Sequence, residues 1–336
     1  MSEMTRQAAI LGAGGAAGRR LALLVAIAII IVLPMIVRTS YWQSILLLCA
    51  LNAVLALGLN LTLGYAGQLN LGHSAFYGIG AYVSTLLVKD LGFGYWLAFI
   101  AGGLAAGLAG IVLSMFAVRL KGHYLGIASL GFALVVYEIL TNWLSVTRGP
   151  LGIYGVRPPP PVVLPGFGRI DFSHLPAFFY LVAGFATLVY LALDSLLRSP
   201  IGECLRTIRE DEISAASLGV NGPYWKIFAF GLGGALAGAA GALYASFVGT
   251  LVPDSFFITE SFTLLAMVIV GGIGTMPGPV IGAIVLTVLP EALRGIGDLR
   301  FIVYGLAMTA AVLFLPGGLM QGWAALRARW RPGLAR

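Results

Sequence analysis

Long apolar runs separated by short polar connections make up most of this 336-residue chain. A helix needs about 20 apolar residues to cross roughly 30 Å of hydrocarbon. The runs are continuously apolar rather than alternating, and lipid offers the backbone no hydrogen-bond partner, so each is expected to be a helix. The sequence thus predicts an all-α, polytopic membrane helical bundle of about 10 crossings. The predicted spans are 21–37, 44–63, 70–88, 95–118, 124–144, 177–197, 227–249, 261–274, 279–293 and 301–316.

Two neighbouring runs, 261–274 and 279–293, are shorter than a full crossing and are joined by the sequence GTMPGP. Irregular backbone at membrane depth survives where protein or a water-filled cavity surrounds it. These two runs are therefore expected either to cross the membrane twice or to form a short re-entrant pair. The total number of crossings accordingly lies between 8 and 10.

The composition supports a membrane protein. The chain is 59% hydrophobic and only 10% charged, whereas soluble domains carry about 25% charged residues. Most of the net charge of +7 flanks the apolar runs rather than forming a nucleic-acid-binding face, and basic flanks mark the cytoplasmic side. We expect a basic cytoplasmic segment at 1–20, a membrane domain at 21–316 and an Arg-rich cytoplasmic tail at 317–336.

Two connections differ from the others. Residues 145–176 contain seven of the sixteen prolines, so we expect an extended, semi-rigid loop on the extracytoplasmic side of the membrane. This loop is either a spacer or a docking rim for an extracytoplasmic partner. Residues 198–226 contain eight charged residues, four of each sign. This segment predicts short cytoplasmic helices broken at Gly219 and at Gly222–Pro223.

Small residues recur four positions apart within the apolar runs. Pairs such as Gly103/Gly107 and Gly234/Gly238 form faces that let helix backbones approach closely. The pattern predicts tight helix packing within the membrane domain.

Sequence motifs for catalysis or nucleotide binding are absent. The GAGGAAG stretch at 12–18 lacks the strand that a dinucleotide fingerprint requires, and the chain has no P-loop, HExxH or GxSxG motif. Its two cysteines, Cys49 and Cys204, lie in different surroundings and have no metal-ligand spacing. We therefore expect a non-catalytic chain without its own cofactor or metal.

Polar residues gather at the cytoplasmic mouth of the second and third predicted spans. Gly64, Gly67 and Gly72 allow the chain to leave the helix there, and polar groups at membrane depth are costly without a partner. This segment either borders the path of a polar solute or forms a structural hairpin. The candidate path residues are Asn60, Gln68, Asn70, His73, Ser74 and Tyr77.

Glu138 is a further candidate because it interrupts the apolar sequence LGFALVVYEILTNWL. An intramembrane carboxylate is a functional hypothesis by default. Its place in the outer half of its helix, near Asn142, leaves contact with interfacial water as the alternative.

Three blocks of sequence together resemble one family. They are LGLNLTLGYAGQLNLGHSAFYGIGAY at 57–82, GECLRTIREDEISAASLGVNGPYWKIFAFGLGGALAGAAGALYA at 202–245, and MVIVGGIGTMPGPVIGAIVL at 267–286. They are similar to the LivM-type permeases of branched-chain amino-acid ABC importers. The resemblance implies a multi-pass protein of the bacterial inner membrane and four partners: a LivH-like permease, two cytoplasmic ATPase subunits that bind ATP and Mg, and a periplasmic solute-binding protein.

The resemblance also implies roles for individual residues. Segment 198–226 would be the coupling loop that docks on the ATPase, with Gly219 as its turn glycine. The importer pattern E-A-A-x-x-x-G is degenerate here, because Ile213 and Ser214 occupy the Glu and first Ala positions. The residues carried over as facing the ATPase are Arg206, Arg209, Glu210, Asp211 and Glu212.

The external loop resembles the family as well. In TRGPLGIYGV, residues Thr147, Gly149 and Gly152 match a T-x-G-x-x-G pattern, which implies contact with the binding protein. The resulting hypothesis is an importer permease subunit that moves branched-chain or other small hydrophobic amino acids by alternating access. The alternative is an ion-coupled secondary carrier or channel, for which Glu138 would supply the acid.

Overall fold

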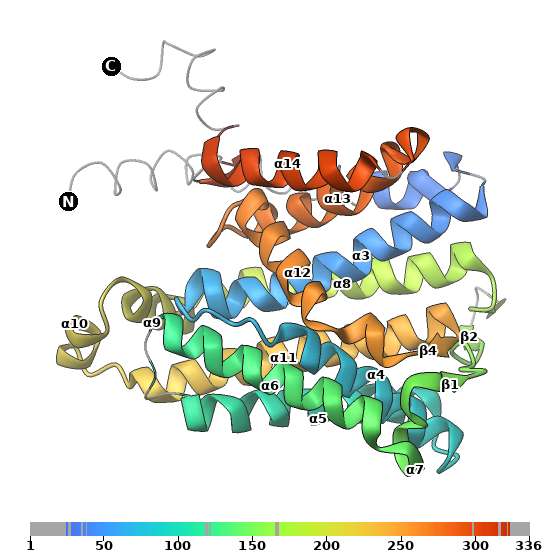
Figure 1. Ribbon diagram of the computed structural model, residues 1–336, viewed down its shortest axis with the longest axis horizontal. Helices are drawn as coiled ribbons and strands as arrows, with labels where there is room; N and C mark the ends of the chain where they lie inside the picture. Colours follow the sequence, from blue (N-terminus) through green and yellow to red (C-terminus); the bar gives the residue numbers. More distant parts are fainter. Residues whose placement is uncertain are drawn as a thin grey trace.

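The computed structural model describes residues 25, 28–34, 36, 37, 39–117, 120, 122–164, 168–297, 299–314, 317–320 and 322. Within this part the chain forms a bundle of long helices that run along one common direction (Figure 1). The basic segment 1–20, part of the first predicted span and most of the tail lie outside the described residues.

The helix positions confirm the predicted fold class, because each run from 44 onwards corresponds to a helix with nearly the same bounds. The long helices are α3 (Ser40–Asn60), α4 (His73–Lys89), α5 (Tyr95–Ala117), α6 (His123–Asn142), α8 (Leu175–Arg198), α11 (Gly222–Val248), α12 (Ile258–Gly271), α13 (Pro277–Ala292) and α14 (Leu299–Phe314).

Seven helical segments of the described residues are long and apolar enough to cross a membrane. Short 3-10 helices at Pro253–Phe256 (η3) and Arg294–Ile296 (η4) lengthen α12 and α13 to segments of 19 and 20 residues. Helices α4 and α14, with 17 and 16 residues, fall just short of that length. The arrangement is compatible with ten crossings.

Helices α4, α5 and α11 pack closely against one another, because small residues let their backbones touch. A side chain added at Gly80 of α4 would overlap the backbone of Gly238 in α11, and one added at Gly238 would overlap Ala106 of α5. Lipid is as apolar as the helices, so this close contact is what holds them together. The predicted tight packing of small faces is confirmed here.

The two unusual connections lie at opposite ends of the bundle (Figure 1). One end carries α9 (Pro200–Glu210) and α10 (Glu212–Ser217). The other carries α7 (Leu144–Thr147), η2 (Gly149–Leu151) and two antiparallel strand pairs. Strand β1 (Ile153–Tyr154) pairs with β4 (Thr250–Leu251), and β2 (Val162–Leu164) pairs with β3 (Gly168–Ile170).

Candidate functional site

Helix α3 does not simply end at Asn60 but widens into a π-helix, η1 (Leu61–Tyr65). Short π-helical turns within helices are rare and frequently mark functional positions. A non-helical stretch follows up to His73, where α4 begins, and Gly67 turns the chain there with a φ of 68°. The predicted break in this segment is confirmed, and it separates two helices of the bundle core.

The π-helix is tied to the turn between α12 and α13 by Asn60. The Asn60 side chain is 1% exposed. Its Nδ2 donates to the carbonyl of Thr275 at 2.9 Å, and its Oδ1 accepts from the amide of Gly274 at 2.9 Å. A side chain at Gly64 would overlap Asn60 and lie 2.7 Å from the Gly274 nitrogen. The two irregular segments therefore form one packed junction.

Helix α9 contacts this junction through two arginines. Arg209 donates from its guanidinium to the carbonyl of Gly64, and its Cγ lies 3.0 Å from where a Gly67 side chain would begin. Arg206 places its guanidinium carbon 5.7 Å from the centre of the Tyr65 ring, within cation–π range. The charged segment 198–226 thus contacts the π-helix directly through both arginines.

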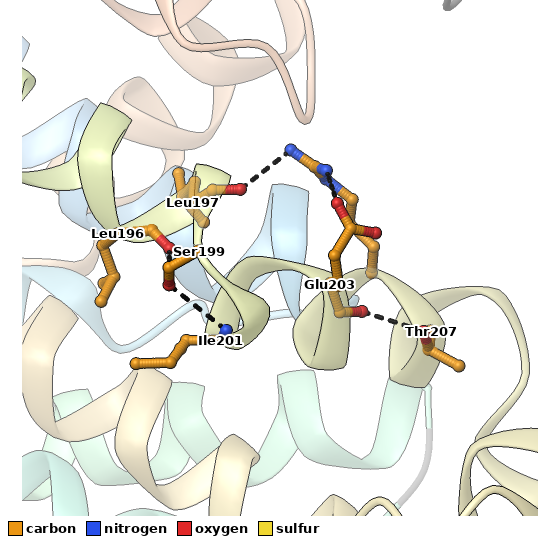
Figure 2. Close-up of polar contacts among 7 residues, drawn as sticks. Leu196, Leu197, Ser199, Ile201, Glu203 and Thr207 are labelled. Atoms are coloured by element: carbon orange, nitrogen blue, oxygen red, sulfur yellow. Dashed lines mark hydrogen bonds and ion pairs between the residues drawn. The ribbon is translucent and has the colours of Figure 1, made fainter.

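The orientation of α9 is set where it leaves α8, as Figure 2 shows. Ser199 donates to the Leu196 carbonyl at 2.6 Å and accepts from the Ile201 amide at 3.3 Å, which caps the new helix. Thr207 donates to the Glu203 carbonyl at 2.9 Å one turn further along. Since the cap fixes the first turn of α9, its two arginines reach the π-helix from a defined direction.

Helix α10 extends farther from the bundle than α9 (Figure 1). Asp211 caps it by accepting from the Ile213 amide at 2.8 Å. Glu212 forms a 2.9 Å ion pair with Lys226 of α11, whose side chain is only 3% exposed. Gly219, with a φ of 81°, turns the chain back toward α11. The first turn of the short helix is therefore anchored to α11, and the chain turns back after its last residue.

Two large apolar side chains are exposed on α10 and at its C-terminal end, a feature that the sequence analysis missed. Ile213 and Leu218 are each 74% exposed. The available signal was two aliphatic residues within a charged segment that cannot cross the membrane. Among the predicted ATPase contacts, Asp211 and Glu212 bind within the segment itself, whereas Glu210 is exposed.

Most of the predicted path residues use their polar groups inside the protein. Asn70 accepts from the Gly72 amide at 2.9 Å, and Gln68 donates to the Ala66 carbonyl at 3.2 Å. Ser74 accepts from Ser261 of α12 through its hydroxyl at 2.9 Å. These contacts favour the structural-hairpin alternative for these groups, and solute contact by them stays a prediction.

His73 and Tyr77 lie deeper in the bundle. His73 is completely buried, and its Nε2 faces the backbone of α3 at Gly58 without a hydrogen-bond partner among the described residues. Tyr77 packs in an aromatic cluster, with ring centres 5.3 Å from Tyr244 and 5.0 Å from Phe256.

The two intramembrane acids of interest differ in their surroundings. Glu138 is exposed on α6 and accepts from Asn142 at 2.7 Å, beside a surface depression of about 570 Å³. The structure does not bring it near the Asn60 junction. Glu260 of α12, which the sequence analysis did not select, is half-buried and directly precedes Ser261, which is hydrogen-bonded to Ser74 of α4.

The three loop residues that match the family's T-x-G-x-x-G pattern form a turn at the end of the bundle opposite α9 and α10. Thr147, Gly149 and Gly152 are all buried. Both glycines have positive φ angles, and a side chain at Gly152 would overlap the carbonyl of Leu251. These three residues therefore set the course of the loop, and Leu151, which is 75% exposed, is what the loop presents. Contact with a binding protein stays a prediction for the loop.

The chain was compared with known proteins. The pattern of the family described as "Branched-chain amino acid transport system / permease component" matches residues 41–320. The LivM permeases of the high-affinity branched-chain amino acid transport systems of Escherichia coli K12 and Salmonella typhimurium LT2 are 36% and 35% identical to it, over 80% of this chain and 67% of each relative.

The high-affinity branched-chain amino acid transport system permease protein LivH of Escherichia coli K12 is 27% identical over 80% of this chain and 90% of its own length. No solved structure matches the chain. The family match covers the π-helix junction, the charged segment and nearly all the described membrane helices. The chain is a multi-pass membrane protein that belongs to the family of permease components of branched-chain amino acid transport systems.

Proposed function

We propose that this chain is one of two permease subunits of an inner-membrane ABC importer for branched-chain or other small hydrophobic amino acids. Both termini lie in the cytoplasm, a LivH-like chain is the second permease, and a periplasmic binding protein delivers the solute. Two separate ATPase subunits bind ATP and Mg and supply the energy, so this chain is not catalytic. The named relatives and the apolar bundle support this assignment.

The observation that carries the proposal is the contact from α9 to the π-helix. Arg209 joins a helix outside the bundle core to the carbonyl of Gly64 within it. Asn60 continues the link to the turn between α12 and α13. A force applied to the charged segment is thereby transmitted to two breaks in membrane helices, which are the places where helices can change direction.

Helix α10 is the docking surface for the ATPase in this proposal. Ile213 and Leu218 present apolar side chains to the cytoplasm, where burial against a partner is favourable at roughly 25 cal/mol per Å². The buried ion pair between Glu212 and Lys226 connects the same helix to α11. ATP-driven movement of the ATPases would therefore act on α9 and α11 together, which fits alternating access.

Co-purification tests the proposal. The tagged chain is expressed with a LivH-like permease and the ATPase subunits, and bound ATPase is quantified after membrane extraction. Ile213→Asp and Leu218→Asp are expected to lower bound ATPase at least fivefold, because a charge replaces a buried apolar contact. The matched control is Leu151→Asp, which places the same charge on an exposed leucine at the opposite end. ATPase binding that survives both α10 changes would contradict the docking assignment.

A further inference from the structure

Acids inside membrane helices are costly unless they find a partner. The long helices of the described residues contain four of them: Glu138, Asp194, Glu260 and Glu291. The short helix η3 before α12 adds Asp254, which accepts from the Tyr137 hydroxyl at 2.8 Å. Three are paired within their own helix or the turn that follows it: Glu138 with Asn142, Asp194 with Arg198, and Glu291 with Arg294. The Glu260 carboxylate makes no hydrogen bond or ion pair with the described residues.

The ordinary structural role of such a residue does not account for Glu260. It lies in the first turn of α12, where an acid can stabilise the helix dipole or cap a backbone amide. Its carboxylate makes no capping hydrogen bond, and α12 starts without a side-chain cap. A helix-dipole contribution of 0.3–1 kcal/mol is, moreover, small beside the cost of an unpaired charge in the membrane.

The position of Glu260 in the bundle is fixed by its neighbour. Ser261 is completely buried, and its hydroxyl accepts from the Ser74 amide and donates to the Ser74 hydroxyl, both at 2.9 Å. This double contact holds α12 against α4. It places Glu260, the residue before Ser261, beside the first turns of α4, where Tyr77 follows Ser74 by one turn.

The surroundings suit a small organic cation. Tyr77 packs with Tyr244 and Phe256 at ring-centre distances of 5.3 and 5.0 Å. Phe256 lies four residues before Glu260, and Tyr77 follows Ser74 by one turn, so this aromatic cluster belongs to the same contact between α4 and the start of α12 as the acid. Aromatic faces attract ammonium groups, and the attraction grows when water is excluded. Glu260 is only half-buried, which leaves it open to a ligand. The segment is also interrupted at Phe257, between η3 and α12, as in other membrane helices that border solute sites.

We propose that Glu260 binds the ammonium group of the transported solute, with the aromatic cluster around Tyr77 beside it. The inference rests on the proposed function, because a small zwitterionic amino acid carries such a group. An inorganic cation such as Na⁺ has related chemistry, and the experiment separates the two.

The test uses vesicles that contain the complete importer, with radiolabelled leucine and the binding protein outside. Glu260→Gln removes the charge but keeps the shape, and we expect leucine uptake to fall about tenfold, the effect of losing one charge-assisted contact. Basal ATP hydrolysis is expected to stay at the wild-type level. Glu260→Asp keeps the charge and should recover at least a third of the uptake.

Glu291→Gln is the matched control, since it neutralises another membrane-helix acid and should leave uptake within twofold of wild type. Equal uptake by Glu260→Gln and wild type would overturn the assignment while the proposed function stands. A wild-type importer that moves no leucine would instead contradict the proposed function. Uptake that requires Na⁺ in the wild type and loses that requirement in Glu260→Gln would assign the site to an inorganic cation and overturn the ammonium proposal.

Discussion

The guanidinium of Arg209 donates a hydrogen bond to the backbone carbonyl of Gly64, although the two residues are 145 positions apart in the sequence. One belongs to a short helix at the end of the bundle, and the other to a π-helix that interrupts a core helix. A π-helix leaves backbone carbonyls without regular helical partners, which makes an arginine a suitable donor. This contact connects the charged segment directly with the backbone of the membrane core.

Removal of that contact should uncouple the importer. Arg209→Ala is expected to lower leucine transport at least fivefold while ATP hydrolysis continues, because the motor would then move α9 without moving the π-helix. The ratio of leucine transported to ATP hydrolysed in vesicles measures this effect. Arg294→Ala, which breaks an exposed ion pair with Glu291, should leave the ratio unchanged. An unchanged ratio for Arg209→Ala would show that force reaches the membrane helices by another route.

The buried ion pair between Lys226 and Glu212 should show an asymmetry between its two partners. Glu212→Gln leaves the ammonium of Lys226, whose side chain is only 3% exposed, without its negatively charged partner. Complete burial would make this loss cost 3–5 kcal/mol; since Glu212 is about a third exposed, we expect about 2 kcal/mol. Lys226→Met removes the buried charge itself and should therefore reduce the stability less than Glu212→Gln does.

Thermal unfolding in detergent measures both variants. Glu203→Gln is the control, because it breaks the exposed pair with Arg206, and exposed pairs are worth about 0–1 kcal/mol. Equal destabilisation by Glu212→Gln and Glu203→Gln would mean that water reaches Lys226.

Backbone contact between α4 and α11 gives a prediction about packing. Gly80→Ala places a methyl group against the backbone of Gly238, and overpacking of this kind costs roughly 1–3 kcal/mol. Gly131→Ala on α6 meets nothing within 4 Å and should be neutral or slightly stabilising, because alanine favours the helix. The unfolding temperatures of the Gly80→Ala and Gly131→Ala variants are compared with that of the wild type. An unchanged unfolding temperature for Gly80→Ala would show that α4 and α11 can move apart at little cost.

The sequence predicted the membrane helices well because hydrocarbon thickness and backbone hydrogen bonding dictate their length and type. The predicted span 95–118 corresponds to Tyr95–Ala117, and 124–144 to His123–Asn142. The break after Asn60 was also predicted, since its glycines and amides do not suit a continuous membrane helix.

The sequence did not predict which polar groups meet. Partners such as Asn60 and Gly274 come together only when distant helices pack, and the sequence contains no local signal for that contact. Glu138 was chosen as a candidate because it is the only charged residue in its apolar run, but in the structure it is exposed and bonded to Asn142. Glu260 was not chosen because another acid, Asp254, lies six residues before it in the sequence. Burial of a single acid depends on its neighbours in space.

Asn60 offers the clearest distinction between a structural clamp and a solute contact. Its Nδ2 donates to the Thr275 carbonyl, its Oδ1 accepts from the Gly274 amide, and the residue is 1% exposed, so both ends of the amide are used inside the protein and a solute has little access to them. Asn60→Leu leaves one buried carbonyl and one buried amide unpaired, at a cost of roughly 2–4 kcal/mol. We expect a lower unfolding temperature and near-normal transport per folded molecule. The exposed amide of Asn142 provides the control, since Asn142→Leu breaks only the contact with Glu138. Transport that falls without any loss of stability in Asn60→Leu would instead place this amide on the solute path.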